Sequence, residues 1–334
     1  MKKFIRYSLI LSLMLVISLF INFKVSDKIV VNASGPKFFQ VGDVLPATTP
    51  QENTYLTFQS TSSFILETSD NTKLWNGTLY YSTDTTTWNV WDGITTLSSV
   101  GNKLYLRGTG NTIITGSSGE SWDLWSPTGS NIECIGNIEN LLDYETVALG
   151  NHPTMANSCY SFMFNGCTSL TTAPSLPATT LADYCYNYMF YGCTGLTTAP
   201  QLPATTLANY CYSGMFSGCT GLTTAPSLPA TTLASACYRS MFQGCTDLTT
   251  APSLPATTLA DYCYYYMFYG CTGLTTAPQL PATTLANYCY SGMFRGCTGL
   301  TTAPSLPATT LADYCYYYMF YGCTGLTTAP QLPA

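Results

Sequence analysis

The stretch CYNYMFYGCTGLTTAPQLPATTLANY, residues 185–210, decides the fold because it is one copy of a repeated unit. Its first cysteine recurs every 26 residues through the C-terminal half, and a second cysteine always follows eight residues later. The unit CYxxMFxGCTxLTTAPxLPATTLAxx occurs seven times within residues 154–334, the last copy stopping at Ala334 after QLPA. A fixed period of this length is typical of repeat architectures, in which neighbouring units stack to bury a shared core. The stop in mid-unit favours a fragment over a capped array.

Each unit contains patterns of two kinds of secondary structure. LTTAP is short, rich in threonine and ended by proline, which predicts a brief strand on a parallel stack, and LPATT predicts a corner. In LAxYCYxxMFxGC, Leu181, Cys185, Met189 and Cys193 recur at every fourth residue, which predicts about two helical turns with these side chains on one face. We therefore predict an α/β repeat solenoid with short parallel strands and short helices.

The motifs GCTGLTTAPSLP and YCYSGMFSGC resemble the AFxGCxxLTxIxIPxxVxxIG unit of BspA-like leucine-rich repeats, which are found on bacterial surfaces. The matching elements are the MF-x-G-C-x-x-L-T core and the Leu-Pro corner, over residues 154–334. Two features differ: the 26-residue unit is longer, and Ala-Pro replaces a branched aliphatic residue, which leaves the strand register open. The resemblance implies a leucine-rich-repeat solenoid that acts as an adhesin or binding surface, and no enzymatic activity is expected of the repeats.

Residues 38–150 lack the repeat and predict a separate β-rich domain. The runs TYLTF, SFILET, TLYYST, TWNVW, NKLYLRG and NTIIT are short, aromatic or β-branched, and separated by Asn, Asp, Gly and Ser, as in a β-sandwich. All five tryptophans lie here, and they are expected in the core, with a surface platform for sugars as the alternative. The following segment, ECIGNIENLLDYETV, is interpreted as the transition into the solenoid, with Leu141 and Leu142 capping the first repeat.

Residues 1–33 predict an export signal. Lys2, Lys3 and Arg6 precede a run of apolar residues from Leu9 to Ile21, a length that fits a signal peptide and is short for a membrane span. Cleavage near Ala33 is expected, and an uncleaved signal anchor is the alternative. We therefore expect a secreted or cell-surface protein whose only membrane contact would be that anchor.

The composition argues against several functional classes. Charged residues make up 8% of the chain and the formal net charge is −6, so the basic face that a nucleic-acid partner requires is missing. The single histidine, His152, has no neighbouring nucleophile motif, and no glycine-rich phosphate loop follows a strand. We predict no catalytic residues, no cofactor and no enzymatic activity.

The 15 cysteines permit three interpretations. A helix would place cysteines eight residues apart about 12 Å from each other, beyond the reach of a disulfide within one unit. Zinc sites use C-x₂₋₄-C spacing and often histidine, which C-x₇-C does not supply, so no metal is predicted. We expect buried thiols acting as small apolar side chains, and disulfides remain open because export permits them.

Tyrosines occupy the positions that change from unit to unit, where side chains are expected at the surface. They could anchor a protein partner or stack on sugars, and the alternative is packing between adjacent units with the hydroxyl groups in water. A second candidate surface is the threonine series of LTTAP. Asp183, Asp261 and Asp313 are interpreted as helix N-caps. The candidate binding residues are Tyr188, Tyr191, Tyr265, Tyr266, Tyr269, Tyr317, Tyr318 and Tyr321.

Together these patterns predict an exported bacterial surface adhesin or recognition protein. Its partner would be a host or bacterial surface protein or a glycan, bound by many weak contacts along the array. One alternative is a carbohydrate-binding accessory protein of glycan foraging that uses the tryptophan-rich domain. The other is a passive stalk in which the repeats only add length.

Overall fold

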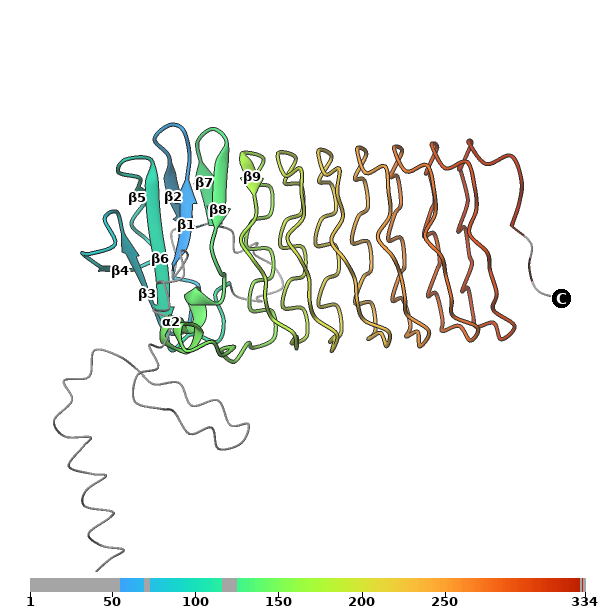
Figure 1. Ribbon diagram of the computed structural model, residues 1–334, viewed down its shortest axis with the longest axis horizontal. Coiled ribbons are helices and arrows are strands. Elements are labelled where there is room, and N and C mark those ends of the chain that lie inside the picture. Colours follow the sequence, from blue (N-terminus) through green and yellow to red (C-terminus); the bar gives the residue numbers. More distant parts are fainter. Residues whose placement is uncertain (1–54, 69–72, 116–124, 331, 333–334) are drawn as a thin grey trace, which may run out of the picture. The chain divides into compact units, whose positions relative to one another are not determined.

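A computed structural model describes residues 55–68, 73–115, 125–330 and 332 (Figure 1). The chain divides into two units, Met1–Ala47 and Thr48–Ala334, and every described residue belongs to the second. The predicted export signal, residues 1–33, therefore lies outside the described residues, as do the first part of the β-rich segment and Trp122.

Short strands dominate the β-rich segment. Five of the six predicted strands are confirmed, whereas NTIIT is wrong, because its residues are not in a strand. One helix, α2 (Asn140–Ala148), follows the strands. The strands are β1 (Leu56–Gln59), β2 (Ile65–Thr68), β3 (Thr78–Ser82), β4 (Asn89–Trp91), β5 (Leu97–Ser98), β6 (Lys103–Thr109), β7 (Trp125–Thr128) and β8 (Ile132–Ile135), with β9 (Leu170–Thr172) in the first repeat.

Two sheets enclose the core of this segment. The larger has the order β4-β3-β6-β1-β8-β9 and the smaller the order β5-β2-β7. Phe58 of β1 and Trp125 of β7 bring their ring centroids to 6.5 Å, so the two sheets share one core, as the β-sandwich prediction requires. The larger sheet also crosses into the repeats, because β8 pairs in parallel with β9. The boundary predicted between residues 150 and 154 stays a prediction.

The first repeat stacks on a coil that does not share its sequence. The Trp125 N–H donates to the Met163 carbonyl at 2.8 Å, just as the Phe164 N–H donates to Met189 one repeat later. Upstream, the Ile114 and Thr115 N–H groups both donate to the Cys159 carbonyl, at 2.9 and 3.0 Å, so this end of NTIIT is bonded to the first repeat. Residues on both sides of the undescribed 116–124 therefore form a cap for the repeats.

Leu141 and Leu142, which were predicted to cap the first repeat, are both buried, and that prediction stays untested. They begin helix α2, which packs against β6. The Leu141 and Leu142 carbonyls accept hydrogen bonds from the Asn111 side chain and from its backbone N–H, at 2.9 and 3.0 Å. The helix thus closes one end of the β-rich segment.

The repeats form successive coils, each hydrogen-bonded to the next, and the predicted helices are wrong (Figure 1). Alternate N–H groups reach different partners: Tyr186 donates to Cys211 of the next coil at 3.0 Å, whereas Met189 donates to Tyr186 at 3.2 Å. The second kind of bond spans three residues and closes a β-turn, so the segment is a series of overlapping turns. Other donors to the next coil in this repeat are Tyr184, Tyr188, Phe190 and Gly192.

A left-handed residue at every fourth position prevents a helix. Tyr184, Tyr188 and Gly192 have φ of 58°, 50° and 68°, and the equivalent residues of the other repeats are also positive. An α-helix requires negative φ throughout. The predicted face itself is confirmed, since the Leu, Cys, Met and Cys side chains of this segment are all buried.

Identical side chains of neighbouring coils lie one above the other in the core. The Tyr186 and Tyr212 rings stack at 5.7 Å, and the Phe190 and Phe216 rings at 5.6 Å, with interplanar angles of 7° and 2°. The predicted strand on the other side of the coil is reduced to single parallel bridges between threonines, such as Thr198 with Thr224. Only the first repeat has a full strand among the described coils, β9.

Candidate functional site

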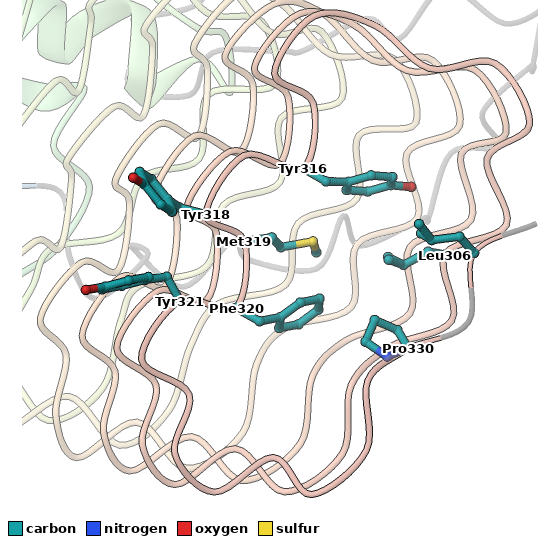
Figure 2. Close-up of a pocket in the computed structure, with 8 residues that line it drawn as sticks. Leu306, Tyr316, Tyr318, Met319, Phe320, Tyr321 and Pro330 are labelled. Carbon is teal, nitrogen blue, oxygen red and sulfur yellow. The ribbon is translucent and has the colours of Figure 1, made fainter.

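Along the series of turns, side chains come in pairs that point alternately into the core and out to the surface. Cys185 and Tyr186 point into the core, the next two residues point outward, and Met189 and Phe190 point inward again. Figure 2 shows this in the seventh repeat, where Tyr316, Met319 and Phe320 lie on the inner side and Tyr318 and Tyr321 on the outer side. The eight predicted binding tyrosines all occupy outward positions. The prediction that they bind a partner stays untested.

The structure divides the outward tyrosines into two clusters. The first cluster consists of Tyr184, Tyr188, Tyr191 and Tyr210. Tyr184 stacks on Tyr210 at 4.7 Å, and Tyr188 meets Tyr191 edge-on at 5.7 Å. Phe162 of the preceding repeat stacks on Tyr188 at 5.3 Å, which extends the apolar surface toward the β-rich segment.

The second cluster is larger and continuous across three repeats. In the fifth repeat the rings of Tyr262, Tyr265, Tyr266 and Tyr269 touch in sequence, with centroids 4.3–5.6 Å apart. The seventh repeat contains the same chain of contacts. Tyr288 of the sixth repeat joins the two by stacking on a ring from each. The members are Tyr262, Tyr265, Tyr266, Tyr269, Tyr288, Tyr314, Tyr317, Tyr318 and Tyr321.

Arg295 supplies a cation at the centre of the second cluster. Its guanidinium carbon lies 5.5 Å from the Tyr269 ring and 5.2 Å from the Tyr321 ring, and it donates a hydrogen bond to the Tyr266 hydroxyl at 3.3 Å. That hydrogen bond is the main cause that raises the pKa of the guanidinium, so Arg295 stays charged. The cluster therefore combines flat aromatic surface with one positive charge.

Glycine in the sixth repeat makes room for a tyrosine of the fifth. A Cβ atom on Gly292 would overlap the Tyr266 ring, and a Cβ on Gly214 would overlap Tyr188 in the same way. Tyrosine-rich coils followed by Ser-Gly coils are thus a packing requirement, because each large outward ring lies over the next coil. The fourth repeat has no tyrosine at the outward positions, which hold Ala236, Arg239, Ser240 and Gln243, and Arg239 extends over the Tyr265 ring of the second cluster at 5.6 Å.

Sequence reasoning missed one set of surface tyrosines, those directly before the first cysteine of each unit. The helix prediction includes this position in the first turn. The position holds tyrosine in five repeats and another residue in two, and this variability is the sequence signal of a surface position. Their rings form stacks on the outer side, as in Tyr262–Tyr288–Tyr314 at 4.8 and 4.7 Å. The missed residues are Tyr184, Tyr210, Tyr262, Tyr288 and Tyr314.

The aspartates predicted as helix N-caps have a different role. The Asp183 carboxylate accepts the backbone N–H of Asn209 at 2.8 Å, and Asp261 accepts that of Asn287 at 2.9 Å. Asn287 in turn accepts the Asp313 N–H at 3.1 Å. The prediction is wrong because there is no helix to cap, and these side chains instead tie the same position of successive coils together.

The threonine side of the coils is the second predicted surface. Thr250, Thr276 and Thr302 form one ladder of parallel bridges, and their side chains are exposed. Thr223 and Thr301 donate their hydroxyl hydrogens to backbone carbonyls of the preceding coil, at 3.1 and 3.2 Å. This side is uncharged and regular.

The cysteines are free and buried, as the apolar interpretation predicts. The thiol of Cys193 donates to the Phe164 carbonyl at 3.0 Å, and the same contact recurs in the following repeats. Burial raises the pKa of the Cys211 and Cys219 thiols to about 12, which keeps them protonated and unreactive. Among the described residues, no three His, Cys, Asp or Glu side chains gather closely enough to bind a metal ion.

The described tryptophans are core residues with one exception. Trp75, Trp91 and Trp125 are buried and touch one another, with ring centroids 4.9–6.4 Å apart. Trp88 is half-buried at the surface of the larger sheet. A surface platform built from several tryptophans is therefore wrong for the residues that the structure describes.

His152 pairs with a buried acid at the junction of the two regions. Its Nδ1 lies 2.8 Å from Oε2 of Glu139, the N-cap residue of α2. Burial raises the pKa of the Glu139 carboxyl, and the hydrogen bond with His152 acts in the opposite direction.

Within the described ranges, no helix is both long and apolar enough to cross a membrane.

Comparison with known proteins assigns the repeats to a family. The family described as BspA type leucine-rich repeat region matches residues 151–275 and 229–330, with six copies in all. No curated protein and no solved structure matches the chain. Leucine-rich repeats of this kind are scaffolds for protein interaction, and the matched residues cover more than half of the sequence. The chain therefore belongs to the BspA type leucine-rich repeat family.

Proposed function

We propose that this chain is an exported bacterial surface protein that recognises a macromolecule of a host or a neighbouring cell through its outward tyrosines. The observation that carries the proposal is the second cluster, in which nine tyrosines and Arg295 form one continuous outer surface. Tyrosine and arginine are the residues that dominate protein interfaces, because each provides a large contact area and a polar group.

Exposure within the cluster supports recognition over packing between coils. Tyr262, which has a coil on each side of it, is 37% exposed, whereas the inward Tyr290 is 1% exposed. Exposed aromatic area of this kind on a repeated scaffold is typical of interaction sites. The export signal expected in residues 1–33 and the family membership are consistent with a cell-surface location.

Two clusters on one scaffold allow multivalent binding. Tyr188 and Tyr266 occupy the same position three repeats apart, which corresponds to about 14 Å at the usual strand spacing. A partner with repeated features, such as a fibrous protein or a glycan, could contact both clusters at once. The second contact then forms at a high effective concentration and strengthens binding without new chemistry.

The test is binding of the purified full-length chain to arrays of extracellular-matrix proteins and host glycans. The variant replaces Tyr265, Tyr269, Tyr317 and Tyr321 with Ser together. We expect binding to fall by at least about tenfold, because aromatic anchors at interfaces each contribute roughly 1–2 kcal/mol or more. Unchanged binding of this variant to a partner of the wild-type chain would remove the tyrosines from the proposal.

A matched control changes the threonine side. Replacing Thr250, Thr276 and Thr302 with Ala alters three exposed positions of the threonine ladder and leaves the tyrosines in place. We expect this variant to bind as the wild type does. Loss of binding here, with the tyrosine variant unaffected, would transfer recognition to the threonine ladder. Failure of the wild type to bind any array member would favour the passive stalk.

A further inference from the structure

A single arginine on the outer face of the larger sheet is surrounded by aromatic rings. The Arg107 site consists of Arg107 of β6 together with Tyr55, Tyr80, Trp88 and Tyr144. Tyr80 of β3 lies directly opposite Arg107 in the strand register. The four rings come from four different parts of the chain: the residue before β1, strand β3, the residue before β4, and helix α2.

The guanidinium group lies between two of these rings. Its carbon is 4.1 Å from the Trp88 centroid and 4.3 Å from the Tyr144 centroid, and 5.7 and 5.9 Å from those of Tyr80 and Tyr55. Trp88 is held by a hydrogen bond from its indole N–H to the Thr85 carbonyl at 3.1 Å, and it packs on Tyr55 at 4.7 Å. Rings at this distance contact the two flat faces of the guanidinium group. Its N–H donors lie in the plane of the group and therefore point outward from its edge.

The charge of Arg107 has no partner in the described part of the chain. The one ion pair there joins His152 and Glu139, and the buried Nε of Arg107 makes no hydrogen bond. The two acids that flank Tyr144 in the sequence are engaged elsewhere: Asp143 accepts the backbone N–H of Gly110 at 3.2 Å, and Glu145 accepts the Tyr144 hydroxyl at 3.3 Å. An arginine with covered faces and unpaired donors is arranged to bind a planar anion in bidentate fashion.

We propose that the Arg107 site binds a sugar that carries a carboxylate, such as a uronic acid residue of an acidic polysaccharide. The carboxylate would accept two parallel hydrogen bonds from the guanidinium, and the apolar face of the sugar ring would pack on the neighbouring aromatic rings. The flat sheet face with its half-buried Tyr55, Tyr80 and Trp88 fits a ring-shaped ligand better than an acidic peptide, which offers a carboxylate and no apolar ring face.

This site lies on the β-rich segment and is independent of the tyrosine clusters. Sequence reasoning considered a sugar platform of several tryptophans, whereas the structure leaves one surface tryptophan among the described residues and adds the cation. No feature of the sequence indicated that Arg107 and Tyr144 would meet, because helix α2 brings Tyr144 over the sheet from 37 residues further along.

The experiment measures binding of the full-length chain to an oligogalacturonate, with tryptophan fluorescence and calorimetry as readouts. Two matched probes accompany it: the same oligosaccharide with its carboxyl groups methyl-esterified, and poly-glutamate. We expect the acid form to bind at least about tenfold more tightly than the ester, the range of a hydrogen-bonded charge pair. Equal binding of acid and ester, or no binding of the acid, would overturn the proposal.

Variants assign the binding to this arginine. Arg107→Gln should lose at least about tenfold in affinity and Arg107→Lys should recover only part of it, because lysine retains the charge and loses the planar fork. The matched control is Lys103→Gln, which removes one positive charge from an exposed position of the same strand, β6. It should bind as the wild type does.

Two further outcomes would overturn the proposal. The first is equal affinity of the Arg107→Gln and wild-type chains, with an unchanged circular dichroism spectrum showing that the variant folds. The second is poly-glutamate binding more tightly than the oligogalacturonate, which would identify an acidic peptide as the ligand. If Arg107→Gln fails to fold, Trp88→Ala replaces it, because that side chain lies at the surface, and its affinity for the acid form should fall in the same way.

Discussion

The β-rich segment and the repeats both bury large aromatic side chains, and they pack them differently. In the β-rich segment Trp91 meets Trp75 and Trp125 at interplanar angles of 37° and 79°. In the repeats the interplanar angle is 0° between the Tyr212 and Tyr238 rings and 2° between the Phe190 and Phe216 rings, so these rings are parallel. Both arrangements suit the quadrupole of an aromatic ring, because edge-to-face pairs and offset parallel pairs each avoid a direct face-to-face sandwich.

Repetition of the sequence accounts for the difference. When identical residues occupy identical positions in successive coils, one translation relates them, so their rings must be parallel. A segment without repeats can tilt each ring to fill the space that its neighbours leave. The repeats therefore gain stability by multiplying one arrangement, and the β-rich segment gains it from contacts that occur once.

Alkaline pH should produce the largest difference between the two regions, because the repeats contain 14 of the 15 cysteines. Cys211 and Cys219 have a pKa of about 12 in the folded chain against an ordinary 9.0. Between these values the unfolded chain binds fewer protons than the folded one. Their stabilising contribution is thus complete below pH 9 and decreases as pH rises toward 12, by up to about 1.4 kcal/mol per thiol and pH unit.

The measurement is urea unfolding between pH 7 and 11, followed by tyrosine circular dichroism for the repeats and tryptophan fluorescence for the β-rich segment. All tryptophans precede the repeats and most tyrosines lie within them, so the two signals give different weight to the two regions. A double variant, Cys211→Ala with Cys219→Ala, should lose less stability on alkalisation than the wild type. A urea midpoint that stays constant up to pH 11 would contradict the assignment of these thiols to the core.

Trp125→Ala should have the next largest effect, because Trp125 belongs to both regions. It touches Phe58 and Trp91, and its backbone takes the place that Phe164 takes one coil later. Removing a fully buried tryptophan side chain costs about 3–5 kcal/mol of unfolding free energy.

Trp125→Phe is the matched variant, since it installs the side chain that the repeats use at this position. It should cost clearly less than the alanine change, partly because the Trp125 indole N–H is buried without a partner. The measurement is the free energy of unfolding from urea titration. Equal losses for both variants would show that the cap does not imitate a repeat.

Phe242→Leu should cost more than Phe64→Leu, although both side chains are buried. Phe242 stacks on a ring of each neighbouring coil, at 5.8 and 5.7 Å, whereas Phe64 has no ring contact with the described residues. We expect about 1–2 kcal/mol more for Phe242, the contribution of two aromatic contacts. Equal unfolding free energies would mean that parallel stacking adds nothing to burial.

Substitutions on the outer surfaces should change stability least. Tyr191→Ser in the first cluster and Val90→Ser in the β-rich segment alter side chains that are 43% and 64% exposed. Each is expected to shift the unfolding free energy by no more than about 0.5 kcal/mol. A much larger loss for Tyr191 would assign the outward tyrosines to packing between coils and weaken the proposed recognition function.

The sequence was sufficient to predict the repeats, their stacking, the buried cysteines and the outward position of the eight tyrosines. The sequence was misleading about the helices. In the series of overlapping turns, each turn begins two residues after the one before it. This arrangement also brings every fourth residue, such as Cys185, Met189 and Cys193, to one buried face, as a helix would. The sequence did contain part of the pattern that distinguishes these turns from a helix. Gly192 is invariant and Gly214 replaces Tyr188 one repeat on, and both positions have positive φ.

The clusters and the Arg107 site were beyond prediction for a different reason. Contacts such as Arg295 with Tyr321, or Arg107 with Tyr144, depend on how far a side chain extends over the next coil or strand. Periodicity assigns a residue to a face, and it does not determine which rings on that face meet.

The hydrogen bonds that join successive coils also have a mechanical consequence. Bonds such as Tyr186 to Cys211 and Phe190 to Met215 cross a single interface side by side, while the interfaces follow one another along the array. Tension between the first and last coils would load all bonds of one interface together and release the coils one at a time. Each released coil adds about 90 Å of extended chain, so the array would lengthen in steps under load and return to its stack when the load is removed.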